Sequence, residues 1–249
     1  MKYVRRFMGA KELLHNTDRW CFWTEGDDFD PSNLSKSPVL RAHIEACRMF
    51  RENSEKTGDA YKLRLTPHRF RPNPSRPRGS YIAIPRHVRE RRRYWLVQRN
   101  GPEIICEDAN FVAEDPDSLF FGLVSSSMFI TWQRTVGGRL ESRVRFANTL
   151  TWNTFPIPEP DEQTRRRIID GGKQVLDARA LYLERSLADH YNPLAMSPEL
   201  TKTHDNLDRE VDKAMGPHAN SPRSANAKRF SLLTTPVWLK IHSICQERR

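Results

Sequence analysis

The feature that most constrains the fold of this chain is a run of arginines between residues 64 and 99. This window holds eleven arginines, no lysine and one acid, Glu90. Its net charge of +10 equals that of the whole chain, so the remaining residues sum to about zero. The arginines are Arg64, Arg69, Arg71, Arg76, Arg78, Arg86, Arg89, Arg91, Arg92, Arg93 and Arg99.

The choice of arginine over lysine indicates a polyanionic partner, with nucleic acid favoured over a membrane surface. A planar guanidinium binds phosphate through two parallel hydrogen bonds and can fork onto a guanine edge, which an ammonium does less well. Prolines interrupt Arg69–Arg78, so this part is predicted to be a solvated, partly disordered loop. Arg86–Arg93 lies between two strand-like runs, Tyr81–Ile84 and Tyr94–Val97, and a fixed scaffold is expected to present it.

Length and composition limit the class of protein. The chain has 249 residues, enough for one large or two modest domains, and 37% of them are hydrophobic. No apolar run approaches the roughly 18 residues of a membrane span, and the first residues lack a signal-peptide pattern. The four cysteines are too few and too widely spaced for a disulfide framework. A cytoplasmic protein with reduced thiols and no membrane partner is expected.

The first part of the chain is predicted to mix strands and helices. An aromatic cluster with Trp20 is expected in the core, and a helix capped by Ser37 should run to Gly58. A second, apolar helix is predicted over residues 117–136, ended by two glycines. In the strand that follows, Arg143 and Arg145 should share one face, with Val144 on the other. The segment from Trp152 is predicted to be a strand leading into a proline-rich linker.

The chain beyond residue 160 is predicted to be helical. One helix is expected over Asp161–Tyr182, interrupted at Gly171–Gly172, and another from the cap Ser197 to Gly216. His204 falls in the apolar stripe of the last helix and is predicted to be a buried, hydrogen-bonded side chain rather than a catalyst. The fold class is therefore α+β: a mixed domain over residues 1–160, a small all-α domain over 161–216, and a divergent tail, for which disorder is considered, over 217–249.

Motifs for catalysis are missing from the sequence. There is no glycine-rich cofactor turn, no phosphate-binding loop, no Asn/Asp-Pro-Pro-aromatic motif, and no nuclease or zinc-protease set. Six carboxylates between Glu103 and Asp117 could suggest a metal site, but an exposed loop is the favoured interpretation. We therefore predict no catalytic, cofactor-binding or metal-binding residue, and the residues alone indicate a binding module.

Four segments resemble a known family of type IIL restriction-modification DNA methyltransferases, the MmeI-like family. They are RRFMGAKELLHNTDRWCFW from Arg5, YIAIPRHVRERRRY from Tyr81, FGLVSSSMFITWQRTVGGRLESRVRFANTLTWNTFPIP from Phe121, and LDARALYLERSLADHYNPLAMSPEL with the following HDNLDREVDKAMG. The resemblance implies a target recognition domain up to the FPIP element and a small helical C-terminal domain after it. In this family an adenine-N6 methyltransferase domain that uses S-adenosylmethionine normally precedes them, often with a nuclease domain.

The resemblance also implies which residues face double-stranded DNA. The stretch expected to approach the duplex contains Arg134, Arg139, Arg143 and Arg145, and the neighbouring hairpin contains Arg86 and Arg91–Arg93. For Arg139, a structural bridge within the turn is nearly as well supported as a contact with DNA. The sequence departs from the family pattern at Arg89, Arg143 and Ala147, which bears on specificity or fit at those positions. From Pro217 onward it loses the family's final helix pattern, which suggests a truncated or frameshifted gene product. The expected DNA-binding residues are Arg86, Arg91, Arg92, Arg93, Arg134, Arg139, Arg143 and Arg145.

Three functional hypotheses follow. The leading one is sequence-specific DNA recognition as the specificity part of an adenine-N6 methyltransferase, inactive alone and able to pair with a separate catalytic chain. The second is a nucleic-acid-binding protein without sequence preference, based only on the arginine window. The third is an inactive remnant that folds poorly.

Overall fold

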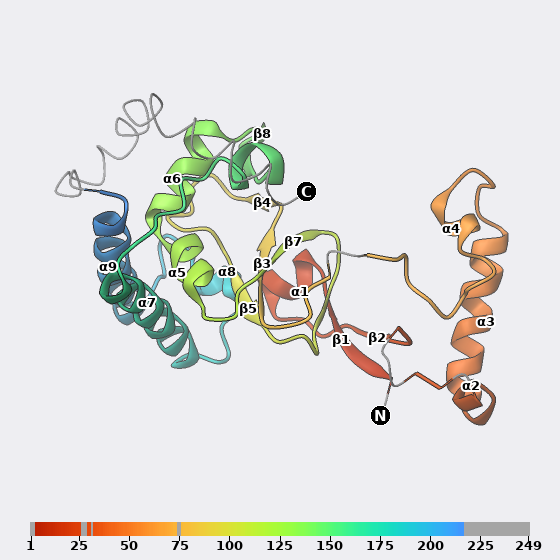
Figure 1. Ribbon diagram of the computed structural model, residues 1–249. Coiled ribbons are helices and arrows are strands. Elements are labelled where there is room, and N and C mark those ends of the chain that lie inside the picture. Colours follow the sequence, from red (N-terminus) through yellow and green to blue (C-terminus); the bar gives the residue numbers. More distant parts are fainter. Residues whose placement is uncertain (1–2, 26–28, 31, 74–75, 217–249) are drawn as a thin grey trace. The chain divides into compact units, whose positions relative to one another are not determined.

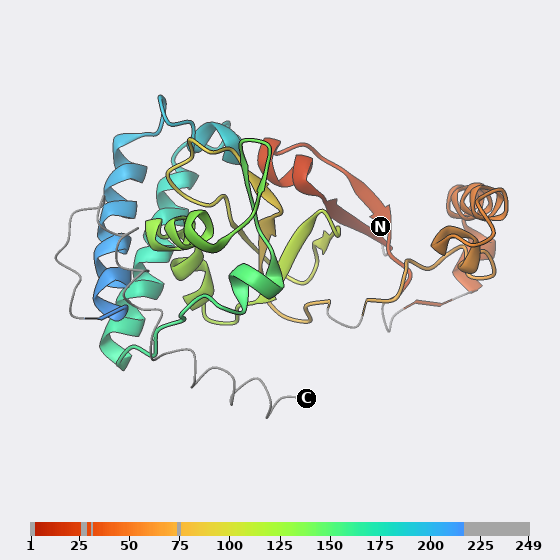
Figure 2. The same ribbon diagram turned by 90° about the horizontal axis from the view of Figure 1, so that it is seen from above.

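The computed structural model describes residues 3–25, 29–30, 32–73 and 76–216 (Figures 1 and 2). The predicted tail over 217–249 lies outside the described residues. Contacts divide the chain into two compact units. Unit 1 comprises Met1–Phe7, Asp18–Arg76 and Glu103–Ile105, and unit 2 comprises Met8–Thr17, Pro77–Pro102 and the chain from Cys106 onward.

Unit 1 combines a short sheet with helices. Strand β1 (Val4–Met8) pairs antiparallel with β2 (Trp20–Phe22), and β6 (Ile105–Cys106) lies on the other side of β1. The prediction that Trp20 belongs to the core is wrong, because its side chain is 60% exposed. The helices are α2 (Ser32–Lys36), α3 (Pro38–Glu52) and α4 (Asp59–Lys62).

Helix α3 begins as predicted and ends earlier than predicted. The Ser37 hydroxyl accepts a hydrogen bond from the Leu40 N–H at 3.3 Å, which confirms the cap. The helix ends at Glu52 rather than near Gly58, because the Ser54 hydroxyl donates to the Phe50 carbonyl at 2.8 Å and competes with the helical pattern.

The side chain of Arg51 binds three carbonyl groups of the basic segment after α4. Nη1 of Arg51 donates to the carbonyls of Leu63 (3.0 Å) and Thr66 (2.8 Å), and Nη2 donates to that of Arg69 (2.7 Å). The start of the predicted solvated loop is therefore anchored to α3, a contact that proline content could not reveal.

Unit 2 is built around a three-stranded antiparallel sheet in the order β5–β3–β7. Strand β3 (Tyr81–Pro85) is central and buried along its whole length, which confirms the strand predicted there. Strand β7 (Asn110–Glu114) lies in the acidic stretch, so the exposed loop favoured for that stretch is wrong in this part. Strand β5 (Gln98–Asn100) completes the sheet.

The strand predicted at Tyr94–Val97 is wrong, because the pairing begins only at Gln98. The four residues before it are buried but have no ladder partner along β3. Instead, Nη1 of Arg179 donates to the Val97 carbonyl at 2.9 Å. A side chain from a distant helix thus satisfies a group that a neighbouring strand would otherwise bind.

The described part of unit 2 contains six α-helices, of which α7 and α9 run side by side (Figures 1 and 2). Their bounds are α1 (Ala10–His15), α5 (Leu119–Ser125), α6 (Ser127–Val136), α7 (Glu162–Ala180), α8 (Leu187–His190) and α9 (Pro198–Ala214).

The single helix predicted over 117–136 is two helices that meet at Ser126. This residue has an extended backbone, and its hydroxyl donates to the Leu123 carbonyl at 2.6 Å. The N–H of Ser127 donates to Oδ1 of Asp208 in α9 at 2.8 Å. A carboxylate from a distant helix therefore caps the start of α6 and stabilises the break.

His204 in α9 is buried and hydrogen-bonded, as predicted. Its Nε2 lies 2.7 Å from the Tyr191 hydroxyl, and Tyr94 stacks on its ring with the centroids 3.9 Å apart. Burial, and then the charges of Arg179 and Arg93, keep the pKa of His204 well below its usual range, so the ring is neutral.

The prediction that Gly171 and Gly172 interrupt the helix is wrong, because α7 is continuous through both. These glycines lie where neighbouring helices approach closely: Gly171 faces Leu207 of α9, and Gly172 faces α5. Their missing side chains permit the packing, and that packing outweighs their low helix propensity.

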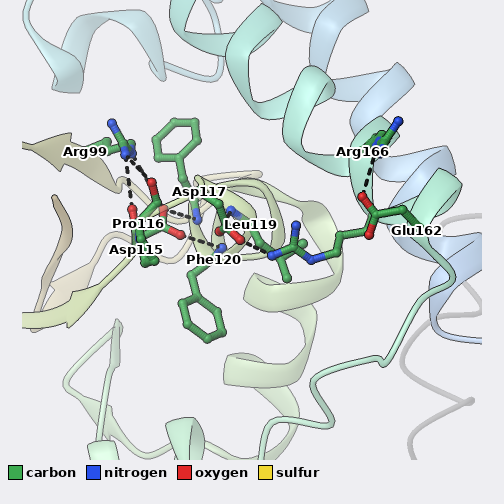
Figure 3. Close-up of polar contacts among 10 residues, drawn as sticks. Arg99, Asp115, Pro116, Asp117, Leu119, Phe120, Glu162 and Arg166 are labelled. Carbon is green, nitrogen blue, oxygen red and sulfur yellow. Dashed lines mark hydrogen bonds and ion pairs between the residues drawn. The ribbon is translucent and has the colours of Figure 1, made fainter. Parts of the chain in front are cut away.

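Two aspartates connect β7 to the helices (Figure 3). Asp115 is fully buried and accepts hydrogen bonds from the N–H groups of Phe120 (3.0 Å) and Phe121 (3.1 Å). Burial raises its pKa. Asp117 forms an ion pair with Arg165 of α7. These carboxylates serve the fold, and no metal-ligand cluster of three or more His, Cys, Asp or Glu occurs in the described part of the chain.

The strand predicted from Trp152 is also wrong. The chain instead forms a π-helical turn, η1 (Asn148–Trp152), before the prolines. The indole N–H of Trp132 donates to the Thr151 carbonyl at 2.9 Å, and the Thr151 hydroxyl accepts from the Ala147 N–H at 3.1 Å. These buried bonds fix a turn that local sequence does not indicate.

We expect Gly122→Ala to lower the free energy of unfolding by about 1–3 kcal/mol, since overpacking forces the backbone to move. A Cβ atom at Gly122 would lie 2.8 Å from Cγ2 and 2.9 Å from the carbonyl oxygen of Ile168 in α7. Gly138→Ala is the matched control, because a Cβ there has no described neighbour within 4 Å. Urea denaturation of both variants measures the difference, and equal stabilities would contradict this account of the contact.

Candidate nucleic-acid interface

A small sheet in unit 2 exposes a basic face. It consists of β4 (His87–Val88), β9 (Arg143–Arg145) and β8 (Arg139–Leu140), in the order β4–β9–β8. His87 is paired with Arg145, and directly paired residues point to the same face of a sheet. Arg143 lies two residues along β9 and therefore shares that face. The predicted placement of Arg143 and Arg145 on one face, opposite Val144, is confirmed.

The other face of this sheet anchors it to the core. Val144 and Phe146 are 1% and 3% exposed. The Phe146 ring lies 4.7 Å from that of Phe111, 6.1 Å from Trp95 and 6.2 Å from Phe129, measured between centroids. Because these large side chains leave β9 little freedom, its two outward arginines project from a rigid support.

Arg86 adds a third exposed guanidinium beside this sheet. Its carbonyl accepts from the Phe146 N–H at 2.9 Å, and its guanidinium carbon lies 5.3 Å from the centroid of the Phe111 ring. Partial burial, followed by the charges of Arg145, Arg143 and Arg86, lowers the pKa of His87. We call His87, Arg143 and Arg145 the basic face, and Arg86 lies beside it.

The loop between β4 and the buried segment Tyr94–Val97 is held by hydrogen bonds and an ion pair of three arginines. Nη2 of Arg134 in α6 donates to the carbonyls of Glu90 (2.7 Å) and Arg92 (2.6 Å). Arg92 is buried, and its Nη1 donates to the Ala188 carbonyl at 2.6 Å. Arg139 forms an ion pair with the Glu90 carboxylate at 2.7 Å, so the structural bridge considered for it is present.

The two remaining predicted arginines lie on the outside of the same loop. Arg91 is exposed. Arg93 is also exposed and lies 4.0 Å from the carboxylate of Asp205, a weak contact at a surface position. The structure thus brings the predicted set together in one unit but divides it into outward side chains and side chains that hold the loop.

Arginines of unit 1 are also engaged within the protein. The guanidinium carbon of Arg76 lies 4.0 Å from the centroid of the Trp23 ring, and its Nη1 pairs with Glu25 at 2.9 Å. Arg71 pairs with Asp59 at 2.8 Å. The charge of the window therefore overstates how many of its guanidinium groups can meet a ligand.

Sequence reasoning omitted His87 from the candidate set. Its one signal in the sequence is its place between Arg86 and Arg89, which does not distinguish a contact residue from a spacer. The register with Arg145 is what identifies it as part of the basic face.

Comparisons with known proteins agree with this architecture. A family model described as "MmeI, target recognition domain" matches residues 1–159, and one described as "MmeI, C-terminal domain" matches 160–236. DNA methyltransferase A of Bacillus subtilis (strain 168) is 31% identical over 212 residues, which are 85% of this chain and 24% of that protein.

A solved structure is similar over nearly the whole chain. It is that of the Type IIL restriction-modification enzyme MmeI in complex with DNA, with a TM-score of 0.83 and 34% identity. The match covers 97% of this chain and 31% of the other. The chain therefore spans a third or less of the length of these two relatives.

We expect Arg134→Gln to lower the free energy of unfolding by about 1–2 kcal/mol, because two loop carbonyls lose a charged donor. Arg91→Gln removes the same charge from the exposed side of the loop and should change stability by less than about 0.5 kcal/mol. Chemical denaturation of the two variants compares them. Equal losses would show that the Arg134 contacts do not hold the loop.

Proposed function

Because this chain belongs to the family of the MmeI target recognition domain, with the matching C-terminal domain after it, we propose that it recognises a specific sequence in double-stranded DNA. In this role it is the specificity part of an adenine-N6 DNA methyltransferase of a restriction-modification system. The observation that carries the proposal is the basic face, whose arginines project from a sheet fixed by a buried aromatic cluster. Base recognition requires side chains held in this way.

The candidate residues divide into two roles in this proposal. Arg92 and Arg134 position the loop through hydrogen bonds to carbonyls, and Arg139 supports it through Glu90. The outward side chains bind DNA, with phosphate contacts fixing the register and base-edge contacts giving specificity. These outward residues are Arg86, Arg91, Arg93, Arg143 and Arg145.

Methyl transfer would depend on a catalytic region like that of the longer relatives, in the same polypeptide or in a separate chain. The described residues do not fit S-adenosylmethionine, which such a region would use. Gly9 separates β1 from α1, but its N–H donates to the Glu12 carboxylate at 2.8 Å, which caps that short helix. We therefore derive no methyl-transfer step from these residues.

DNA is favoured over a lipid surface as the polyanion, because the family model that matches residues 1–159 is that of a target recognition domain. No helix among the described residues has the length and apolarity to cross a bilayer.

Binding of nucleic acid without sequence preference is the second candidate function, supported by the remaining exposed charge. Salt dependence separates it from sequence-specific binding, because phosphate contacts alone weaken steeply with salt.

The first test is selection of binding sites from a randomised duplex DNA pool by the full chain, at low and near-physiological salt. We expect an enriched motif that persists at the higher salt and is altered or lost in Arg145→Gln. Arg166→Gln is the matched control: Arg166 is an exposed arginine on α7 paired with Glu162 at 2.9 Å (Figure 3). Unselective binding that disappears with salt, in both variants alike, would refute sequence recognition.

A further inference from the structure

His87 occupies a position on the basic face beside three arginines. It is paired with Arg145 across β4 and β9, and Arg143 lies on the same face. Arg86 precedes it in the chain. Among the described residues, the charges that lower its pKa are those of Arg145, Arg143 and Arg86, after the larger effect of partial burial. The free protein therefore holds this imidazole in its neutral form near neutral pH.

A phosphate group on this face would reverse the local electrostatics. Each phosphodiester carries a negative charge, and an opposite charge nearby favours the protonated form of histidine. The imidazolium has two N–H donors, whereas the neutral ring has one, so protonation also adds a donor for phosphate oxygen. The neighbouring guanidiniums, which oppose protonation in the free protein, would be neutralised by the same ligand.

We propose that His87 is a DNA-contacting residue that takes up a proton from solvent when a DNA phosphate binds beside Arg143 and Arg145. This inference rests on the proposed function, and it adds a residue and a pH dependence to the DNA-binding face. The proton remains on the imidazole while the phosphate is bound and returns to solvent on release.

The direction of the effect follows from linkage. In the free chain the pKa of His87 lies below its ordinary value, and bound phosphate raises it. Between these two pKa values, binding takes up as much as one proton, so the association constant rises by at most about tenfold for each unit that pH falls. At pH values above the bound-state pKa, and equally at values below the free-state pKa, the titration of His87 does not change the affinity for DNA.

The test measures binding of the full chain to a short, fluorescently labelled duplex of random sequence at low salt. Anisotropy titrations span about pH 5.5 to pH 8, the range in which histidine titrates. The variants are His87→Gln, which cannot be protonated, and His87→Arg, which is always charged. His15→Gln is the matched control, because His15 is exposed in the last turn of α1.

We expect the wild-type chain and His15→Gln to bind roughly three- to tenfold more tightly at the acidic end. His87→Gln should lose this dependence and bind weakly throughout, and His87→Arg should bind tightly at every pH. A wild-type slope retained in His87→Gln, or no slope in the wild type, would overturn the inference while DNA binding stood. If the wild-type chain bound no duplex at any pH, both the inference about His87 and the proposed function would fail. Circular dichroism at both pH limits verifies the fold of each variant.

Discussion

The structure depends on arginine side chains that donate to backbone carbonyls far away in the sequence. Arg134 binds two carbonyls of the loop that follows β4, Arg51 binds three in the segment after α4, and Arg179 binds the Val97 carbonyl and the Tyr191 hydroxyl. A guanidinium is planar, always charged and less strongly hydrated than an ammonium, so it can satisfy several oxygens with little loss of solvation. These contacts fix segments that have no ladder or helix of their own.

The same contacts decide which of the candidate arginines remain outward. Nη1 of Arg92 and Nη2 of Arg134 donate to backbone carbonyls, so these N–H groups hold the loop. The outward arginines are fewer than the charge count suggests. Arg143 and Arg145 lie on a small sheet supported by Phe146 and Trp95, and Arg91 and Arg93 lie on the neighbouring loop. Specificity of recognition requires such rigidity, since a mobile arginine binds phosphate equally well at any sequence.

The helices after residue 160 support this arrangement. Tyr94 stacks on His204 of α9, and Asp208 of the same helix caps α6. Ala188 accepts the hydrogen bond of Arg92. The part of the chain that matches the family's C-terminal domain thus supplies partners to the loop that carries Arg91 and Arg93, and both lie within unit 2.

The sequence by itself determined the elements whose signals are local. The caps Ser37 and Ser197, the buried strand at Tyr81, the alternation of Arg143, Val144 and Arg145, and the buried His204 all follow from side-chain chemistry and periodicity. The family resemblance also lay in the sequence. Tertiary structure alone decided the break at Ser126, the continuity of α7 through Gly171, the η1 turn and the register that brings His87 beside Arg145. In each of these cases the deciding partner, such as Asp208, Leu207 or Trp132, is remote in sequence, and a pattern within one segment carries no information about a group that reaches it only when the chain folds.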